Sequence, residues 1–285
     1  MISFVKSQKN PLSFAKILLI DLNYTISEWF FQVVRDKINS RKHQGGYSMK
    51  KALIFFGGWQ GHEPEPISAR FARILEKNGF SVDRVEGVEC LSDAERLLEY
   101  DLIVPVMTMS ELPRAYEKNI SYAVSHGVGL AGAHGGMCDA FRNSVDWQFI
   151  TGGQWVSHPG GDGVTYTVNI NHGSSPITEG LADFEVTSEQ YYLHVDPAIE
   201  VLATTRFPIY NHYHSANKPV DMPVVWTKYW GLGRVFYCSL GHRDGEFDKY
   251  PTMETLMERG MLWASLGKTD AARNGATADK FVNKN

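Results

Sequence analysis

The chain has 285 residues, 43% of them hydrophobic and 21% charged, a balance typical of a globular protein. Its 28 basic and 32 acidic side chains give a formal net charge of −4. Lys and Arg form no stripe or block, so we expect no nucleic-acid partner. Three widely spaced cysteines form neither a disulfide framework nor a CxxC metal motif, which favours a reducing, cytoplasmic location. No apolar run approaches the roughly 20 residues that cross a bilayer, so we expect no membrane partner.

The first 48 residues look unlike the rest, and MKKALIFFGGWQGHEP, which begins at Met49, is typical of the opening of an α/β domain. We expect residues 1–48 to be an N-terminal extension outside the core, with a short amphipathic helix around Ser27–Asn39. An ordinary helix packed on the domain is the alternative. We predict one domain over residues 49–267. Residues 268–285 are polar without apolar periodicity and should form a loose tail.

Apolar runs of strand length alternate with helical patterns through the first part of the domain. We predict strands at KALIFF, SVDRVE, DLIVPVM and VGLAGA, and helices over Ile67–Asn78, DAERLLEY and LPRAYEKNISYAVSHG. This alternation predicts an α/β fold with a mainly parallel sheet and helices on both faces. After Gly161 the runs VTYTVNI, FEVTSEQYYLHV, EVLATTRF, MPVVWTKYW and GRVFYCSL are strand-like, and PTMETLMERGMLWASLG closes the domain as a helix.

A histidine lies in the loop after three of the predicted strands. His62 lies in GGWQGHEP after the first, His134 in HGGM after the fourth, and His242 in GHRDGE after GRVFYCSL. His158 interrupts the glycine-rich segment GGQWVSHPGGDG. Ligands of open parallel sheets bind outside the carboxyl ends of the strands, where such loops gather. We therefore expect at least three of these four histidines to share one pocket.

Two kinds of chemistry suit such a pocket. Three histidines and a carboxylate hold divalent metals such as zinc or manganese, whereas without metal the same groups act as general acid and base. The dispersed spacing differs from the HExxH motif, so the sequence leaves the metal open. Glu189 in TSEQYYLHV is the candidate carboxylate. Strand alternation would put Glu189 and Tyr191 on one face and His194 on the other, unless a bulge intervenes.

Other residues have less specific interpretations. Trp59, Trp155 and Tyr191 have flat faces that suit sugar rings, with core packing as an equal alternative. His212 and His214 would share a face of a strand. We interpret His43, His126 and His172 as ordinary surface or satisfied histidines.

The segment GLAGAHGGMCDAF predicts a strand end, a cramped glycine turn and the start of a helix. Many α/β enzymes mount a serine or cysteine nucleophile at such a bend, but here the residue is His134. Cys138 lies one helical turn further on and is expected to be a buried, inert thiol. Acyl transfer therefore has no obvious nucleophile.

Together FFGGWQGHEP, GLAGAHGGMCDAF, GGQWVSHPGG, EQYYLH and PVVWTKYWGLGRVFYCSLGHR resemble the ThuA-like (trehalose utilization) family, from about Lys50 to Leu266. The resemblance implies a flavodoxin-like three-layer sandwich related to class I glutamine amidotransferases. Those enzymes carry a catalytic cysteine where this chain has His134, which argues against glutaminase activity. One position departs from the family pattern. An Asp-Glu pair is expected before the tyrosines, and here Ser188 precedes Glu189.

Members of this family are associated with bacterial catabolism of trehalose and related disaccharides, often beside dehydrogenases that oxidise the 3-hydroxyl. The resemblance implies a small-molecule sugar substrate, and we expect an oxidised (3-keto-)disaccharide or glycoside that is processed by elimination, hydrolysis or isomerisation. Elimination is one option that the chemistry suggests. A 3-keto group acidifies the proton on carbon 2, so a base can remove it and the glycosidic oxygen can leave. We expect His134, Glu189 and His242 to be catalytic. We expect the sugar to be bound by Trp59, His62, Trp155, His158 and Tyr191, and any metal by His62, His134, His158 and His242.

Two alternatives stay open at this point. One is a non-catalytic carbohydrate-binding or regulatory protein on the same scaffold, and a weaker one is a metal-dependent hydrolase of another small molecule. The aromatic residues in YYLHV and VVWTKYW fit the interface of a homo-oligomer as well as the core of one chain.

Overall fold

The computed structural model describes residues 49–173 and 175–281. The extension expected over residues 1–48, and the helix expected around Ser27–Asn39, lie outside these residues.

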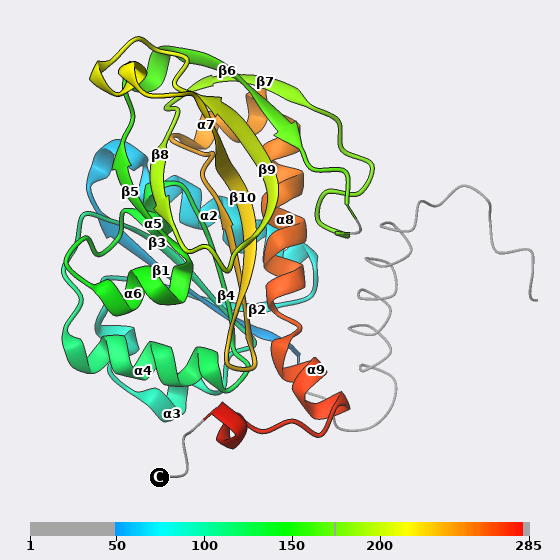
Figure 1. Cartoon of the computed structure of the whole chain (residues 1–285). Coiled ribbons are helices and arrows are strands. Elements are labelled where there is room, and N and C mark those ends of the chain that lie inside the picture. The colour runs from blue at the N-terminus through cyan, green and yellow to red at the C-terminus, as the bar shows by residue number, and fades with distance from the viewer. Residues whose placement is uncertain (1–48, 174, 282–285) are drawn as a thin grey trace, which may run out of the picture.

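The described residues form a nine-stranded sheet in the order β2-β1-β3-β4-β11-β10-β9-β6-β7 (Figure 1). Its strands in chain order are β1 Lys51–Gly58, β2 Ser81–Glu86, β3 Leu102–Thr108, β4 Gly129–Ala133, β6 Val164–Ile170, β7 Phe184–Ser188, β9 Glu200–Phe207, β10 Val220–Trp230 and β11 Gly233–Cys238. A separate antiparallel pair consists of β5 Gly153–Ser157 and β8 Tyr192–Val195.

The sheet is mixed. Strands β2, β1, β3, β4 and β11 pair in parallel, and β10, β9, β6 and β7 continue the sheet in antiparallel fashion. Every residue of β3 is buried, as expected for a parallel strand covered on both faces. The predicted α/β class is confirmed, and the predicted parallel pairing holds for the five-stranded part. The second half is antiparallel because few helices separate its strands, and parallel neighbours need a long crossover.

Helices cover both faces of the parallel part (Figure 1). The α-helices are α2 Pro64–Lys77, α3 Ala94–Leu97, α4 Arg114–Ser125, α5 Gly135–Cys138, α6 Val145–Thr151, α7 Asp244–Lys249, α8 Pro251–Ala264 and α9 Gly267–Arg273. Short 3-10 helices are η2 Gln60–His62, η3 Glu89–Leu91, η4 Gly161–Gly163, η5 Tyr213–Ala216 and η6 Ala278–Phe281.

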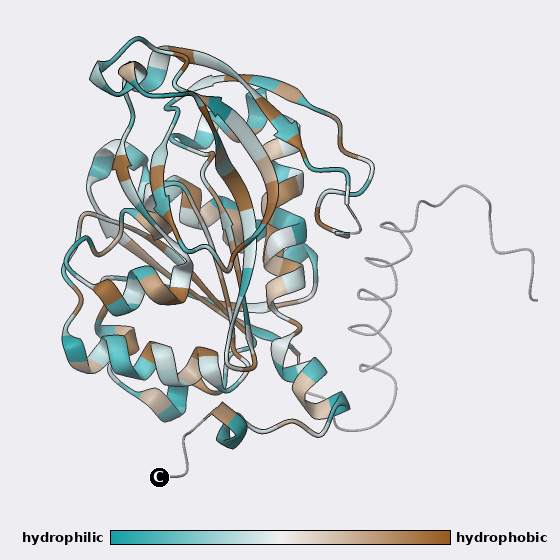
Figure 2. Cartoon of the chain, in the orientation of Figure 1, coloured by the Kyte–Doolittle hydropathy of each residue, from teal (hydrophilic) through white to brown (hydrophobic). Residues whose placement is uncertain are grey.

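Two apolar clusters hold these layers together. Helices α2 and α8 share one cluster with the strands, and α3, α4 and α6 share the other on the opposite face. Figure 2 shows hydrophobic residues along the sheet strands, while the helices carry both hydrophobic and hydrophilic residues. The apolar periodicity of the predicted helices therefore marks the side that each one turns to the sheet.

One local prediction was wrong, and the strand on which two others depended does not form. The run FEVTSEQYYLHV is not one strand, because β7 ends at Ser188 and β8 begins at Tyr192 in the other sheet. Strand alternation thus does not place Glu189, which lies in the break. His212 and His214 lie at and in η5, not on a strand.

The beginning of the expected loose tail is helical. Helix α9 forms over Gly267–Arg273, and an ion pair between Arg234 of β11 and Asp270 fastens it to the sheet. No helix in the described part of the chain has the length and apolarity to cross a bilayer.

Candidate functional site

Three histidines from separate loops converge at the carboxyl edge of the parallel strands. His62 lies in η2 after β1, His134 follows β4 and His242 follows β11. The ring centroids of His62 and His134 are 4.7 Å apart, those of His62 and His242 5.1 Å, and those of His134 and His242 5.5 Å. All three side chains are buried. The predicted convergence of these histidines is confirmed.

The bend at His134 has an unusual backbone. His134 adopts φ 48° and ψ −139°, and its amide donates a 2.7 Å hydrogen bond to the carbonyl of Cys238. Such a conformation is strained for a residue with a Cβ and persists only where the surroundings hold it. A Cβ at Gly135 would lie 2.3 Å from Cε1 of His62, so glycine is needed there for the two rings to approach.

The same strain recurs along this edge. Glu63, Met109 and His134 are the non-glycine residues with positive φ in the described ranges, at 45°, 50° and 48°. They follow β1, β3 and β4 respectively. Strained backbone gathers at functional sites more than elsewhere, which supports assigning function to this edge.

Glu189 is the centre of the cluster. Its Oε2 lies 3.0 Å from Nε2 of His134 and 3.5 Å from Nδ1 of His242. Nε2 of His62 lies 3.9 Å from the same oxygen. The other carboxylate oxygen, Oε1, lies 3.6 Å from Nδ1 of His158. One carboxylate therefore contacts imidazoles on both of its oxygens, and it joins His158 to the other three histidines.

Neighbouring polar groups orient these side chains. Nδ1 of His134 lies 2.7 Å from the carbonyl oxygen of Ser239, and Nδ1 of His62 lies 3.0 Å from Oγ1 of Thr108. Contacts of this kind on the far nitrogen fix the orientation of an imidazole ring.

Burial controls the charges of the cluster. Burial lowers the pKa of His134 to about 4, although its hydrogen bond with Glu189 opposes that shift. Burial likewise lowers the pKa of His242. Burial alone would raise the pKa of Glu189, but its contacts with His134 and His62 outweigh this effect and hold the pKa well below its usual range. At neutral pH Glu189 is therefore a carboxylate beside the neutral imidazoles of His134 and His242.

The predicted aromatic residues all contact the cluster, each in a different way. Tyr191 is buried and stacks on His134, with ring centroids 4.0 Å apart. The ring centroids of Trp155 and His158 are 5.4 Å apart. Trp59 lies edge-on to His62 at 4.7 Å and is 45% exposed. Tyr191 thus supports His134 from inside, while Trp59 offers a face to solvent.

Four of these side chains have the positions that a metal site requires. One donor atom from each of His62, His134, Glu189 and His242 lies within 4.8 Å of the others, and all four residues are buried. Imidazole nitrogen and carboxylate oxygen are ligands of zinc and other divalent transition metals. Nδ1 of His242 is buried without a hydrogen-bond partner, as is Nδ1 of His158. The expected metal ligands were His62, His134, His158 and His242. The group of four in the structure contains Glu189 and not His158.

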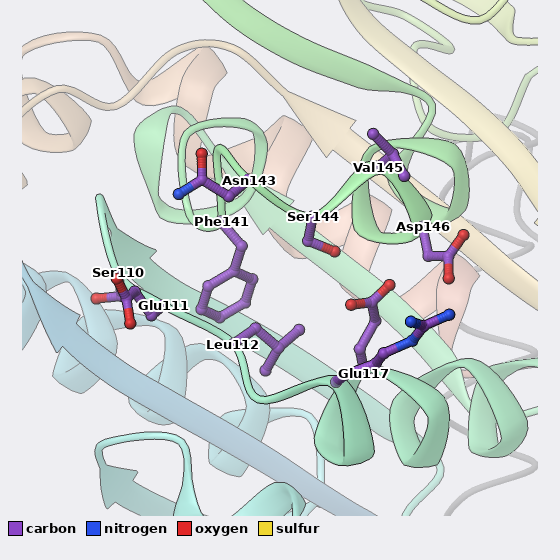
Figure 3. A pocket seen from close by; sticks show the side chains of 10 residues that line it. Ser110, Glu111, Leu112, Glu117, Phe141, Asn143, Ser144, Val145 and Asp146 are labelled. Carbon is purple, nitrogen blue, oxygen red and sulfur yellow. The ribbon is translucent and has the colours of Figure 1, made fainter.

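Of two cavities in the described part of the chain, one is lined by residues of the cluster and the other is not. One of about 10 Å³ lies beneath His62, His134 and Thr108, enough for about one water molecule. Another of about 540 Å³ lies where α4 and α6 begin, with Phe141 and Glu117 in its wall, and no cluster residue lines it (Figure 3). Trp59 and His158 are the more exposed side chains beside the cluster, at 45% and 34%.

A profile of the ThuA family, described as trehalose utilisation, matches residues 51–264. The chain belongs to the ThuA family. It is similar to solved ThuA-like proteins from Bacteroides uniformis and Parabacteroides merdae, each 20% identical, with TM-scores of 0.61 and 0.60. Both alignments cover 78% of this chain, and 94% and 91% of those chains. A cytoplasmic protein from Salmonella typhimurium is 14% identical with a TM-score of 0.52, covering 77% of this chain and 98% of that one. At these identities the likeness shows the fold alone. No protein with a curated description matches this chain.

In this ThuA-family chain the thiol near the bend is buried, as expected. Cys138 is buried, and burial raises its pKa well above the ordinary value. Thiolate, the reactive form, is therefore scarce at neutral pH.

Sequence reasoning missed three groups that hold the ThuA-family site in place, Thr108, Glu246 and the carbonyl of Ser239. The signal for Thr108 was its position at the end of β3, beside the two strands whose loops carry His62 and His134. Glu246 lies four residues after His242, and its carboxylate accepts hydrogen bonds from the amide of His242 and from Oγ of Ser188. Backbone carbonyls such as that of Ser239 leave no signal in the sequence.

Proposed function

We propose that this protein acts in sugar catabolism of the trehalose utilisation type, on a 3-keto-disaccharide or 3-keto-glycoside. The observation that carries the proposal is the Glu189 carboxylate, flanked by imidazoles on both oxygens. It lies at the carboxyl edge of the sheet, where α/β proteins bind ligands. Membership of the ThuA family supports the substrate class.

The reaction needs proton transfers and no covalent nucleophile. The ketone at carbon 3 acidifies the hydrogen on carbon 2, a base takes that proton, and the electron pair forms an enolate. The enolate then expels the glycosidic oxygen from carbon 1, and an acid gives that oxygen a proton. Water adds to the resulting conjugated double bond, which returns a proton to carbon 2. The sum is hydrolysis of the glycosidic bond.

The exposures of the side chains support a division of these tasks. His158 is the most exposed histidine of the cluster, and we assign it the proton transfers at the substrate. The Glu189 carboxylate lies 3.6 Å from Nδ1 of His158 and would stabilise the positive charge of that ring when it holds a proton. His134 and His242 are buried and contact the other carboxylate oxygen, Oε2. They complete the catalytic group on the side away from solvent. Trp59 and Trp155 would pack against the sugar rings, as aromatic faces do.

We also propose that the scaffold is flavodoxin-like and that the protein has no glutaminase activity. The parallel part of the sheet has the order β2-β1-β3-β4-β11, which is the flavodoxin order when those five strands are numbered in sequence. The bend carries His134, and Cys138 is a buried thiol. Three unpaired cysteines support a reducing, cytoplasmic location.

The test uses the purified full chain and 3-keto-trehalose in deuterated water. We expect release of glucose together with uptake of deuterium at carbon 2, because the mechanism breaks that C–H bond. Glu189→Gln and His158→Ala should each lower kcat by about 100-fold or more, the usual contribution of general acid–base catalysis. His172→Ala, at an exposed position, is the matched control and should keep full activity.

Each other result contradicts a named part of the proposal. Glucose release without deuterium uptake would replace elimination with direct hydrolysis. Binding of the keto sugar without turnover would favour the non-catalytic carbohydrate-binding alternative. If the keto sugar is neither bound nor turned over, the proposed substrate class is wrong.

A further inference from the structure

We infer that this chain binds one divalent transition-metal ion. The four donors are Nε2 of His62, Nε2 of His134, Nδ1 of His242 and Oε2 of Glu189. The inference concerns the ion alone and does not depend on the sugar chemistry proposed above.

The surroundings of His134 are the first argument. Its Nδ1 lies 2.7 Å from the carbonyl oxygen of Ser239, and its Nε2 lies 3.0 Å from Oε2 of Glu189. Both neighbours accept hydrogen bonds, but a neutral imidazole has only one N–H. If that proton lies on Nδ1, towards the carbonyl, a lone pair of Nε2 faces a lone pair of the carboxylate. A cation between those two atoms turns this repulsion into attraction.

The other two histidines repeat this arrangement. Nδ1 of His62 lies 3.0 Å from Oγ1 of Thr108, which leaves Nε2 directed at Glu189. His242 is 3% exposed, and its Nδ1 is buried without a hydrogen-bond partner while it lies 3.5 Å from the same carboxylate oxygen. Buried polar atoms normally have a partner, so this nitrogen calls for a ligand.

The spacing of the donors fits a coordination sphere. Zinc–nitrogen and zinc–oxygen bonds of about 2.0–2.2 Å place neighbouring tetrahedral ligands about 3.3–3.6 Å apart. The nitrogens of His134, His242 and His62 lie 3.0, 3.5 and 3.9 Å from Oε2 of Glu189, which brackets that separation.

The donor set also indicates the class of ion. Three imidazoles and one carboxylate suit zinc and its first-row neighbours, whereas calcium and magnesium prefer oxygen ligands throughout. Such an ion, when bound, polarises a carbonyl oxygen of a substrate. Glu189 keeps Oε1 for His158, so its two oxygens serve different partners.

The test measures metal binding directly. The full chain is stripped with a chelator, dialysed and titrated with Zn²⁺ against a competing indicator. We expect one equivalent to bind, and Co²⁺ to give a visible absorption spectrum of nitrogen and oxygen ligation when it replaces zinc. Both readouts are independent of any enzymatic activity.

Variants separate the four donors from their neighbours. Glu189→Gln and His242→Ala should abolish stoichiometric binding. Thr108→Val keeps the volume of the side chain and removes the contact with His62, so it should weaken binding by about 10–100-fold, as outer-sphere changes do. His158→Ala removes the neighbour of Oε1 of Glu189 and should weaken binding without abolishing it. His126→Ala, far from the cluster, is the control and should bind as tightly as the wild type.

Circular dichroism and thermal unfolding of each metal-free variant show whether it folds. If a ligand variant fails to fold, Thr108→Val still tests the inference. The inference is overturned if the folded wild type binds neither Zn²⁺ nor Co²⁺ in stoichiometric amount. In that case a proton, rather than a metal ion, lies between His134 and Glu189. Loss of binding in His158→Ala with retention in Glu189→Gln would also overturn the donor set.

Discussion

His134 occupies its place because of the two residues that follow it. Its φ of 48° lets the chain turn from β4 into α5, and the turn directs the imidazole at Glu189. Gly135 has no Cβ, which leaves room for the ring of His62, and a Cβ on Gly136 would lie 3.1 Å from Cα of Val106. The glycines in HGGM therefore do more than form a turn, since Gly135 permits the approach of two histidine rings and Gly136 permits close packing on β3.

We predict that Gly135→Ala damages the site. The new methyl group would lie 2.3 Å from Cε1 and 2.4 Å from Nδ1 of His62, so the ring must move away from Glu189. Overpacking of this kind costs about 1–3 kcal/mol of unfolding free energy. We expect a lower melting temperature and loss of the cluster's metal binding, measured by thermal unfolding and zinc titration.

Gly245→Ala is the matched control for that substitution. Gly245 lies in α7 and a Cβ there meets open space. Alanine is preferred to glycine within helices by about 0.5–1 kcal/mol, so this variant should be as stable as the wild type or more stable. An equal loss of stability in the two variants would contradict the argument from His62.

At the scale of elements, the site depends on contacts between segments far apart in the sequence. Glu246 of α7 accepts hydrogen bonds from Oγ of Ser188 at 2.9 Å and from the amide of His242 at 3.2 Å. It therefore ties the end of β7, next to Glu189, to the loop that carries His242. The serine that precedes Glu189, in place of the expected acidic residue, is a partner in this contact.

We predict that Glu246→Ala weakens this connection. It leaves the buried hydroxyl of Ser188 and the amide of His242 without their acceptor, which costs about 1–3 kcal/mol. Chemical denaturation should report the loss. Glu246→Gln keeps an acceptor oxygen and should restore most of the stability, which distinguishes this positioning role from a need for the charge. If the two variants lose the same stability, the charge itself is what matters.

Arg70 joins three helices beside the cluster. Its guanidinium donates to Asp244 at 2.6 Å, to Glu254 at 2.8 Å and to Asp248 at 3.0 Å, which links α2 to α7 and α8. These contacts, led by that with Asp244, raise the pKa of Arg70, so the group stays charged. The arginine side chain itself is only 10% exposed.

We predict that Arg70→Lys does not replace arginine here. An ammonium group cannot make the bidentate contacts of a guanidinium, and three carboxylates would remain close together. We expect a loss of about 1.5–3 kcal/mol in chemical denaturation, the usual contribution of hydrogen bonds to charged groups. Arg73→Lys, on the same helix, is the control, and an equally large loss there would contradict this role for Arg70.

The sequence predicted individual elements well where local pattern decides them. The bounds of β2 and β6 match the predicted runs, and α2 and α8 follow their apolar periodicity. It failed at FEVTSEQYYLHV, because the break between β7 and β8 is set by which sheet each half joins. That tertiary choice places Glu189 at the centre of the site, and no residue pattern in the run indicates it.

At the scale of the whole molecule, convergence of the histidines was predictable because topology decides it. Parallel strands end at one edge, so loops after β1, β4 and β11 meet whatever their separation in sequence. The mixed character of the sheet was not predictable in the same way. Strands β9, β6 and β7 are joined to it by pairings whose direction depends on the path of the loops between them.

The packing of the whole domain controls its three thiols. Cys138 and Cys238 lie in the two apolar clusters on opposite faces of the sheet, and Cys90 is half-buried in η3. Burial raises the pKa of Cys90 to about 11 and that of Cys238 to about 12. Burial also raises the pKa of Cys138 well above its ordinary value. Because burial disfavours the charged thiolate, each group stays a thiol through neutral pH.

We predict slow alkylation of the folded protein at pH 7, with Cys90 as the first site. The rate at Cys90 should rise about tenfold per pH unit up to its pKa near 11, because the thiolate is the nucleophile. Cys138 and Cys238 should react only when the sheet and its covering helices separate, so their labelling rate in native conditions measures opening of the domain.

Peptide mass spectrometry after timed iodoacetamide labelling distinguishes the sites, and a small free thiol is the control for reagent reactivity. Labelling of Cys238 as fast as Cys90 in the folded protein would mean that the β11 side of the core opens far more readily than its packing implies.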